Sequence, residues 1–323
     1  MYRFDTVALR VEPADLADAA GLHGLCASLG SVPEAGAAAD AVRSATLHLH
    51  PCGNDAPSGA SIRYDTREFR ILDDDHGSYV TDGLSTLHIR AGHSQADAYL
   101  DDSFHRRPRL VQSQFWSFCI LALLRPLGYF SLHAAAVVAP DAAGTLIVGP
   151  SGSGKSTLAV GLIRAGWGYS SDDAVLLCQR SQTVHALTLR TQFYVDGAAA
   201  SSYEDMRLGR ETVDAAGGVR RQLHIDERYA DRRVAESRPR LVLFPTIVDA
   251  ERSTIVRLDV ASTVQRLLNA SGPQLFDRAC MTRHLAVLGC LARQADAYRL
   301  DAGRDLHRQP AAVLDLIQRA EQS

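Results

Sequence analysis

One loop sequence near the middle of the chain constrains the fold more than any other feature. Residues 149–156 (GPSGSGKS) match the pattern GxxxxGK[ST] in full, follow the apolar run 145–148, and precede a segment with helical spacing at 156–165. In this pattern the glycines allow backbone N–H groups to converge on phosphate oxygens, and the helix N-terminus adds its positive dipole. The sequence therefore predicts a strand, a phosphate-binding loop and a helix in succession.

The loop carries the side chains that a bound nucleotide requires. Lys155 is the only lysine in the chain, although lysine and arginine together number 34. We expect its ammonium to reach the β and γ phosphates and the Ser156 hydroxyl to ligate Mg²⁺. The residues predicted to hold the nucleotide are Gly149, Pro150, Ser151, Gly152, Ser153, Gly154, Lys155, Ser156 and Thr157.

An acid pair returns to the loop soon after the predicted helix. Asp172 and Asp173 stand at the start of the apolar run 174–177, so one helix and one turn bring them back beside the phosphates. Adjacent residues on an extended chain point to opposite faces, but at a strand end both carboxylates can approach one site. One would then face Mg²⁺ and the other an acceptor hydroxyl. A transporter ATPase is disfavoured, because the chain has no LSGGQ-like segment.

A histidine precedes the loop in a predicted strand. His133 lies within 129–138, a segment rich in alanine and valine. An imidazole placed beside the aspartates would tune the base among them. The alternative is an ordinary structural histidine, and the sequence leaves both open.

Pattern and turn composition divide the chain into three parts. We predict a small, mostly β N-terminal domain over 1–108, a connecting helix over 109–127, and an α/β P-loop domain with C-terminal helices over 128–323. The short turn at 141–144 predicts a hairpin, so the sheet of the P-loop domain should be mixed.

Two further predictions concern the elements around the loop. We predict strands over 129–138 and 168–177. The arginine-rich segment 220–240 predicts an irregular, partly helical surface. Within it, Arg220 and Arg221 are candidates for contact with a phosphate or with an acceptor.

Composition excludes several classes of protein. The net charge of -3 lacks the basic excess that binding to nucleic acid usually needs. The longest apolar run, 115–124, is too short to span a bilayer, so no membrane association is expected. No secretion signal is recognisable at residues 1–10, which makes the cytoplasm the expected location. The six cysteines form no CxxC pair and are expected to be buried or incidental thiols.

Three segments together resemble a known family. Ser131-Leu-His133, then GPSGSGKST, then Gly168-Tyr-Ser-Ser-Asp172-Asp173 before an apolar strand look like the catalytic domain of the HPr kinase/phosphorylase family. The resemblance covers about 128–177 and continues more loosely to the C-terminus. It implies a P-loop fold related to phosphoenolpyruvate carboxykinase, and phosphorylation of a serine hydroxyl with ATP and Mg²⁺.

The resemblance also implies roles for individual residues. Asp172 would be the general base, Asp173 would lie beside it at the metal with Ser156, and His133 would assist. Asp196 in the sequence FYVDG would correspond to the family's later acidic metal ligand.

The chain departs from the family in one segment. It has no segment like ExRGxG, so recognition of HPr and a hexameric assembly do not transfer. Its nearer likeness is to HPr-kinase-like serine kinases of peptide-modification systems, such as those acting on lasso-peptide precursors.

The sequence thus predicts a kinase that uses ATP and Mg²⁺ to phosphorylate an aliphatic hydroxyl, with a serine of a peptide or protein as the expected acceptor. A small-molecule hydroxyl kinase is an alternative, disfavoured by the long segment before the loop. A nucleotide-binding regulator or scaffold is another, disfavoured by the acid pair, because binding alone needs no base. Assembly into a homo-oligomer stays open.

Overall fold

The fold is described from a computed structural model. The described residues are 2–13, 22, 32–33, 43–51, 56–65, 69–91, 93–107, 109–189, 193–197, 206, 208–213, 218–271 and 278–321. Contacts divide the chain into two compact units, Met1–Phe130 with Pro273–His284, and Ser131–Gly272 with Leu285–Ser323. The division into domains at 108 and 127 stays a prediction.

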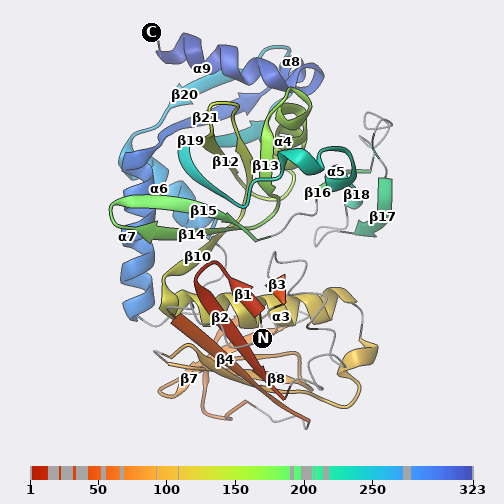
Figure 1. Cartoon of the computed structure of the whole chain (residues 1–323), viewed down its shortest axis with the longest axis vertical. Helices are drawn as coiled ribbons and strands as arrows, with labels where there is room; N and C mark the ends of the chain where they lie inside the picture. The colour runs from red at the N-terminus through yellow and green to blue at the C-terminus, as the bar shows by residue number, and fades with distance from the viewer. Residues whose placement is uncertain are drawn as a thin grey trace. The chain divides into compact units, whose positions relative to one another are not determined.

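The first unit contains a mixed nine-stranded sheet with the order β3-β1-β2-β4-β9-β8-β7-β6-β5. Its elements are β1 (Tyr2–Phe4), β2 (Val7–Glu12), β3 (Val32–Pro33), β4 (Arg43–His50), β5 (Ser61–Asp65), β6 (Arg70–Asp74), β7 (Gly77–Thr81), β8 (Thr86–Arg90), β9 (Gln95–Tyr99) and α3 (Arg109–Leu124). In β4, the buried residues Ala45, Leu47 and Leu49 alternate with half-buried ones, as expected for a strand with one covered face. The helix α3 packs against β4, β8 and β9 through a side that buries Phe115 and Trp116 (Figure 1).

A second mixed nine-stranded sheet forms the framework of the other unit. Its strands are β10 (Tyr129–Leu132), β11 (Ala134–Val138), β12 (Ala143–Val148), β13 (Gly168–Ser171), β14 (Val175–Arg180), β15 (Thr183–Thr188), β19 (Glu236–Ile247), β20 (Thr254–Arg257) and β21 (Asp296–Ala302). The main order is β10-β14-β15-β19-β12-β11-β13, and β21 pairs with both β19 and β20. The strands β12, β19 and β21 run parallel, whereas β11 is antiparallel to β12 and β13.

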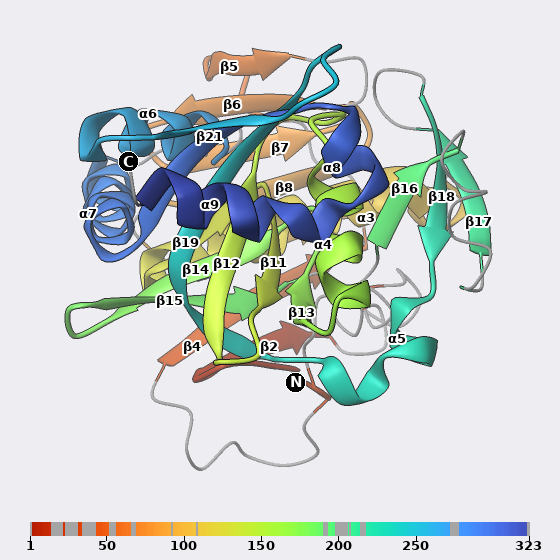
Figure 2. The same ribbon diagram turned by 90° about the horizontal axis from the view of Figure 1, so that it is seen from above.

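Six helices of the described chain accompany this second sheet, and several of them pack against the helix that follows the loop. They are α4 (Lys155–Arg164), α5 (Ile225–Arg228), α6 (Val260–Asn269), α7 (Arg278–Gln294), α8 (Arg304–Arg308) and α9 (Val313–Glu321). Figure 2 shows α9 crossing in front of β12 and β11, with α4 beside it. Leu162 of α4, Leu306 of α8 and Ile317 of α9 share a buried cluster with Ile147 of β12 and Leu300 of β21. This packing holds the first turn of α4 beside the end of β12.

A small three-stranded sheet is attached to the same core. Its order is β16-β18-β17, with β16 at Phe193–Asp196, β17 at Leu208–Val213 and β18 at Val219–Leu223. Phe193 and Val195 of β16 belong to the buried cluster that contains α4. The small sheet is therefore anchored to the core through β16.

Each of the two strands predicted around the loop, 129–138 and 168–177, is divided into two strands in the structure. His133 separates β10 from β11, and its N–H donates to Ala270 O at 2.8 Å instead of to a neighbouring strand. Asp173, with a φ of 65°, lies in the bend between β13 and β14. The prediction of single strands is therefore wrong at His133 and at Asp173, and both residues are candidate site residues.

Other predictions have mixed outcomes. The mixed α/β architecture is confirmed, and the turn at 141–144 does join the antiparallel strands β11 and β12. The prediction for 220–240 is confirmed in part, because the segment contains the short helix α5 and is mostly exposed or half-buried. It is wrong in part, because the segment also contains most of β18 and the start of β19. The described cysteines that are buried free thiols are Cys119, Cys178, Cys280 and Cys290. Within the described ranges, no helix has both the length and the apolar character needed to cross a membrane.

Candidate functional site

The glycine-rich loop connects β12 to α4 in a backbone shape that its glycines permit. Gly152 and Gly154 have φ values of 81° and 93°, in the left-handed region that glycine enters without steric cost. A Cβ added to Gly149 would lie 2.6 Å from Ser153 Oγ, so a side chain there would collide with the loop itself. The backbone therefore requires glycine at 152 and 154, whereas a side chain at 149 would displace the Ser153 hydroxyl.

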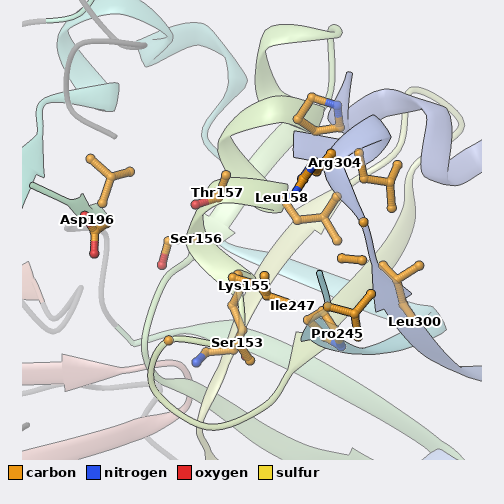
Figure 3. Close-up of a pocket in the computed structure, with 18 of the residues that line it drawn as sticks. Ser153, Lys155, Ser156, Thr157, Leu158, Asp196, Pro245, Ile247, Leu300 and Arg304 are labelled. Atoms are coloured by element: carbon orange, nitrogen blue, oxygen red, sulfur yellow. The ribbon is translucent and has the colours of Figure 1, made fainter. Parts of the chain in front are cut away.

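A cavity of about 660 Å³ opens at the start of α4. Its lining includes Asp196 and Arg220 of the small sheet, and Ile247 and Leu300 at the ends of β19 and β21. In Figure 3, the first turn of α4 lies between Asp196 on one side and Ile247 and Leu300 on the other. The cavity therefore has a polar side at the small sheet and a mostly apolar side that also carries Asp249 and Arg304, with the loop between them.

Lys155, His133 and Asp173 form a hydrogen-bonded chain. Lys155 Nζ donates to Pro150 O at 2.8 Å and lies 3.1 Å from His133 Nε2. Because an ammonium has no acceptor, Nε2 must accept, and the imidazole proton must lie on Nδ1. Nδ1 then donates to Asp173 O at 2.7 Å. With Lys155 as an ammonium, these contacts correspond to His133 with its proton on Nδ1.

The Lys155 ammonium is held where water barely reaches it. The residue is only 6% exposed, and this burial is the main influence that lowers its pKa. The charges of Asp172 and Asp173 raise the pKa again, while the charge of Arg220 lowers it. A cation with so little water around it is stabilised by a nearby anion.

Asp172 is buried against the loop. Ser156 Oγ lies 3.0 Å and 2.9 Å from the two carboxylate oxygens of Asp172 and donates to them, and Tyr194 N lies 3.3 Å from Oδ2. The side chain is almost completely buried. Burial, reinforced by the charge of Asp173, raises the pKa of Asp172 to about 6.

This raised pKa predicts that Asp172→Asn stabilises the protein in metal-free buffer. Between about pH 4 and pH 6, Asp172 ionises in the unfolded chain while the folded protein keeps its proton, so stability falls as the pH rises through this range. Above pH 6 the cost of the buried charge is fully present. We expect Asp172→Asn to raise the free energy of unfolding by about 1 to 3 kcal/mol at pH 8.

Urea unfolding at pH 8 and pH 4.5 measures this effect. The gain should fall to about a third of its pH 8 value at pH 4.5, because the unfolded chain is still largely ionised at Asp172 there. The matched control is Asp315→Asn, at an exposed position of α9, which should change stability by less than about 0.5 kcal/mol at either pH. An Asp172→Asn protein that is no more stable than wild type at pH 8 contradicts the prediction.

Asp173 occupies a different environment from its neighbour. Its side chain is 48% exposed, and Oδ1 lies 3.3 Å from His133 Nδ1. Its left-handed backbone is uncommon for a residue other than glycine, although aspartate tolerates it better than most. The bend directs the two adjacent carboxylates into separate places, one buried at Ser156 and the other at the surface beside His133.

The remaining candidates are separated by the structure. Asp196 lines the cavity but belongs to no group of three or more acidic, histidine or cysteine side chains suited to a metal, and the described residues contain no such group. Arg220 Nη2 donates to Ser151 Oγ of the loop at 2.7 Å. Arg221 instead pairs with Glu211 of β17, with 3.2 Å between Nη2 and Oε2, and does not line the cavity.

One site residue was not predicted from the sequence. The backbone N–H of Tyr194 contacts Asp172, and the Tyr194 side chain lines the cavity. Tyr194 precedes Asp196 in β16, but no sequence pattern links this segment to the loop, since only the fold brings them together.

Comparison with known proteins gives little further information. No protein-family model matches the chain, and no curated protein matches it. Among solved structures, the chain is similar to the HPr(Ser) kinase/phosphatase from Coxiella burnetii, with 15% sequence identity and a TM-score of 0.31, over 59% of this chain and 96% of that chain. A TM-score of this size carries no argument about fold or activity, so the function is inferred from the site itself.

Proposed function

We propose that this protein is a phosphotransferase that binds Mg²⁺ and ATP at the loop and transfers the γ-phosphoryl group to a hydroxyl. The proposal rests on the different environments of the two adjacent aspartates. Asp172 is bonded to the hydroxyl of Ser156, while Asp173 is exposed beside Lys155 and His133. An exposed carboxylate beside the phosphate loop can accept the proton of an acceptor hydroxyl.

The loop side chains fit the phosphates of a nucleotide. Ser153 is 8% exposed, and its Oγ is a buried polar atom for which the described part of the chain provides no hydrogen-bond partner. Such atoms are costly to leave unsatisfied, and a phosphate oxygen at the loop would satisfy this one. Lys155 and Arg220, which both line the cavity, supply positive charge for the same group.

The site also fits a magnesium ion bound with the nucleotide. Mg²⁺ usually takes one or two protein oxygens, with phosphates and waters completing its shell. Ser156 and Asp172 offer such oxygens next to each other. When bound, the ion would neutralise charge on the phosphates.

The apolar side of the cavity fits the nucleoside. The cavity of about 660 Å³ is far larger than a phosphate group needs and lies within the range of small-molecule sites. Ile247, Leu300 and Leu306 supply an apolar wall on which a planar base can pack. This favours a nucleoside triphosphate over inorganic phosphate or pyrophosphate as the donor.

The environments of the two aspartates suggest roles opposite to those implied by the family resemblance. A peptide hydroxyl can approach the exposed carboxylate of Asp173 more easily than the buried one of Asp172. We therefore assign Asp173 as the base and Asp172, with Ser156, to the metal. In the transfer, the bond from the γ-phosphorus to the β,γ-bridging oxygen breaks, the acceptor oxygen bonds to that phosphorus, and the acceptor proton passes to Asp173.

The experiment is a transfer assay read by intact mass. The protein is incubated with ATP, Mg²⁺ and a pool containing serine peptides, an HPr-like protein and free hydroxylated metabolites. We expect a gain of about 80 Da, one phosphoryl group, on a serine-bearing peptide or protein, with none when Asp173→Asn replaces the wild type. A gain on a metabolite alone would indicate a small-molecule kinase. Bound nucleotide with no transfer to any acceptor would favour a regulator.

A further inference from the structure

Arg220 lies in β18 of the small sheet, where it lines the cavity. In the antiparallel pair of β16 and β18, Asp196 lies opposite Arg220 and Tyr194 lies opposite Gln222. Residues directly opposite each other share one face of a sheet. Tyr194, Val195, Asp196 and Arg220 all line the cavity, so the end of β16 and the adjoining part of β18 form one of its walls. The next residue, Arg221, points to the other face.

The Arg220 guanidinium reaches the phosphate-binding loop. Nη2 donates to Ser151 Oγ at 2.7 Å. A guanidinium presents five N–H groups in a planar fork that suits phosphate oxygens. Arg220 also lies close enough to Lys155 for its charge to act on that ammonium. Lys155 and Arg220 thus bring two positive charges to the same cavity.

We propose that Arg220 binds the phosphoryl group that is transferred, as a second cationic contact that approaches from β18 while Lys155 approaches from α4. This inference rests on the proposed function. The guanidinium exchanges its hydrogen bond to Ser151 Oγ for bonds to the terminal phosphate. During transfer, negative charge spreads over the three outer oxygens of the phosphoryl group, and a forked cation stabilises that charge.

Neighbouring arginines provide a matched pair of variants. Arg220→Gln removes the charge at the cavity, and Arg221→Gln removes a charge one residue later on the opposite face, where it pairs with Glu211. The first measurement needs no acceptor: calorimetric titration with ADP and with the β,γ-imido analogue of ATP, both with Mg²⁺. Arg220→Gln should weaken binding of the triphosphate analogue about tenfold and that of ADP less than threefold. Arg221→Gln should change neither by more than about twofold.

The second measurement is the rate of phosphoryl transfer. Arg220→Gln should lower kcat about 100-fold, and Arg220→Lys should recover only part of the loss, because an ammonium lacks the fork. Unchanged binding of ADP shows that Arg220→Gln is folded.

The two proposals fail in distinguishable ways. If wild-type protein binds neither nucleotide, the proposed function fails. If it binds both, and Arg220→Gln leaves the preference for triphosphate over diphosphate unchanged, only the assignment of Arg220 is overturned. An equal effect of Arg221→Gln on that preference would overturn it as well.

Discussion

Replacement of Lys155 by alanine is expected to lower kcat for phosphoryl transfer about 1,000-fold. The ammonium is buried at the start of α4, where charge acts through little water, and it can reach the outer phosphates by leaving His133 and Pro150. Lys155→Arg should be almost as inactive, because a planar guanidinium does not fit the place of a compact ammonium in a tight loop.

The matched control for this prediction is Arg164→Ala. Arg164 is a basic residue in the same helix as Lys155, but it lies at the exposed far end. Its replacement should leave kcat within about twofold of wild type, since exposed surface substitutions have small effects. Transfer by Lys155→Ala at a third of the wild-type rate or more would refute the role given to the ammonium.

The second large effect is expected for Asp173. Asp173→Asn should lower kcat about 1,000-fold while the KM for ATP stays within about threefold, because the amide cannot accept the acceptor proton but the phosphate site is untouched. Asp172→Asn should behave differently. It should raise the Mg²⁺ concentration needed for half-maximal rate about tenfold or more, since it replaces a carboxylate at Ser156.

Kinetics at varied Mg²⁺ and ATP separate the two aspartates. The proposed roles require that the Mg²⁺ effect follow Asp172 and the loss of kcat follow Asp173. The opposite pattern, with Asp172→Asn losing kcat at saturating Mg²⁺ and Asp173→Asn losing affinity for Mg²⁺, would exchange the roles.

The loop and the acid pair could be predicted because their signals are local in the sequence. The glycine pattern, the apolar run before it and the helical spacing after it all lie within about two dozen residues, and Asp172 follows directly. The environments of the two aspartates could not be predicted in the same way. They depend on the left-handed backbone of Asp173, which aspartate permits but does not require.

The central strand β19 shows why another part of the fold was missed. Three of its first five residues are charged, and the fourth is Pro239. A proline normally argues against a central strand. In the structure, Gly144 of β12 pairs with Pro239 and Thr145 pairs with Leu241, so the register shifts at Arg240. This irregularity accommodates the proline. The parallel partners β12 and β21 lie far away in the sequence, where no local pattern indicates them.

The small sheet was missed for a related reason. The strand β18 includes Arg220 and Arg221, and its described side chains are mostly exposed or half-buried, so it lacks the apolar alternation that predicts a strand. Its pairing with β16 and β17 determines which arginine faces the cavity. The sequence therefore predicts both arginines as candidates for phosphate contact but does not show which of them lines the cavity.

The binding of a nucleoside triphosphate around Lys155 is tested most directly by amine labelling, because the chain has a single lysine. The protein is treated with acetic anhydride, and peptide mass spectrometry follows acetylation of Lys155, with the N-terminal amine as internal reference. ATP with Mg²⁺ at ten times its Kd should slow labelling of Lys155 about tenfold, while the N-terminal amine reacts as before and adenosine gives no protection. Equal labelling of Lys155 with and without saturating ATP and Mg²⁺ would contradict a nucleotide site at this loop.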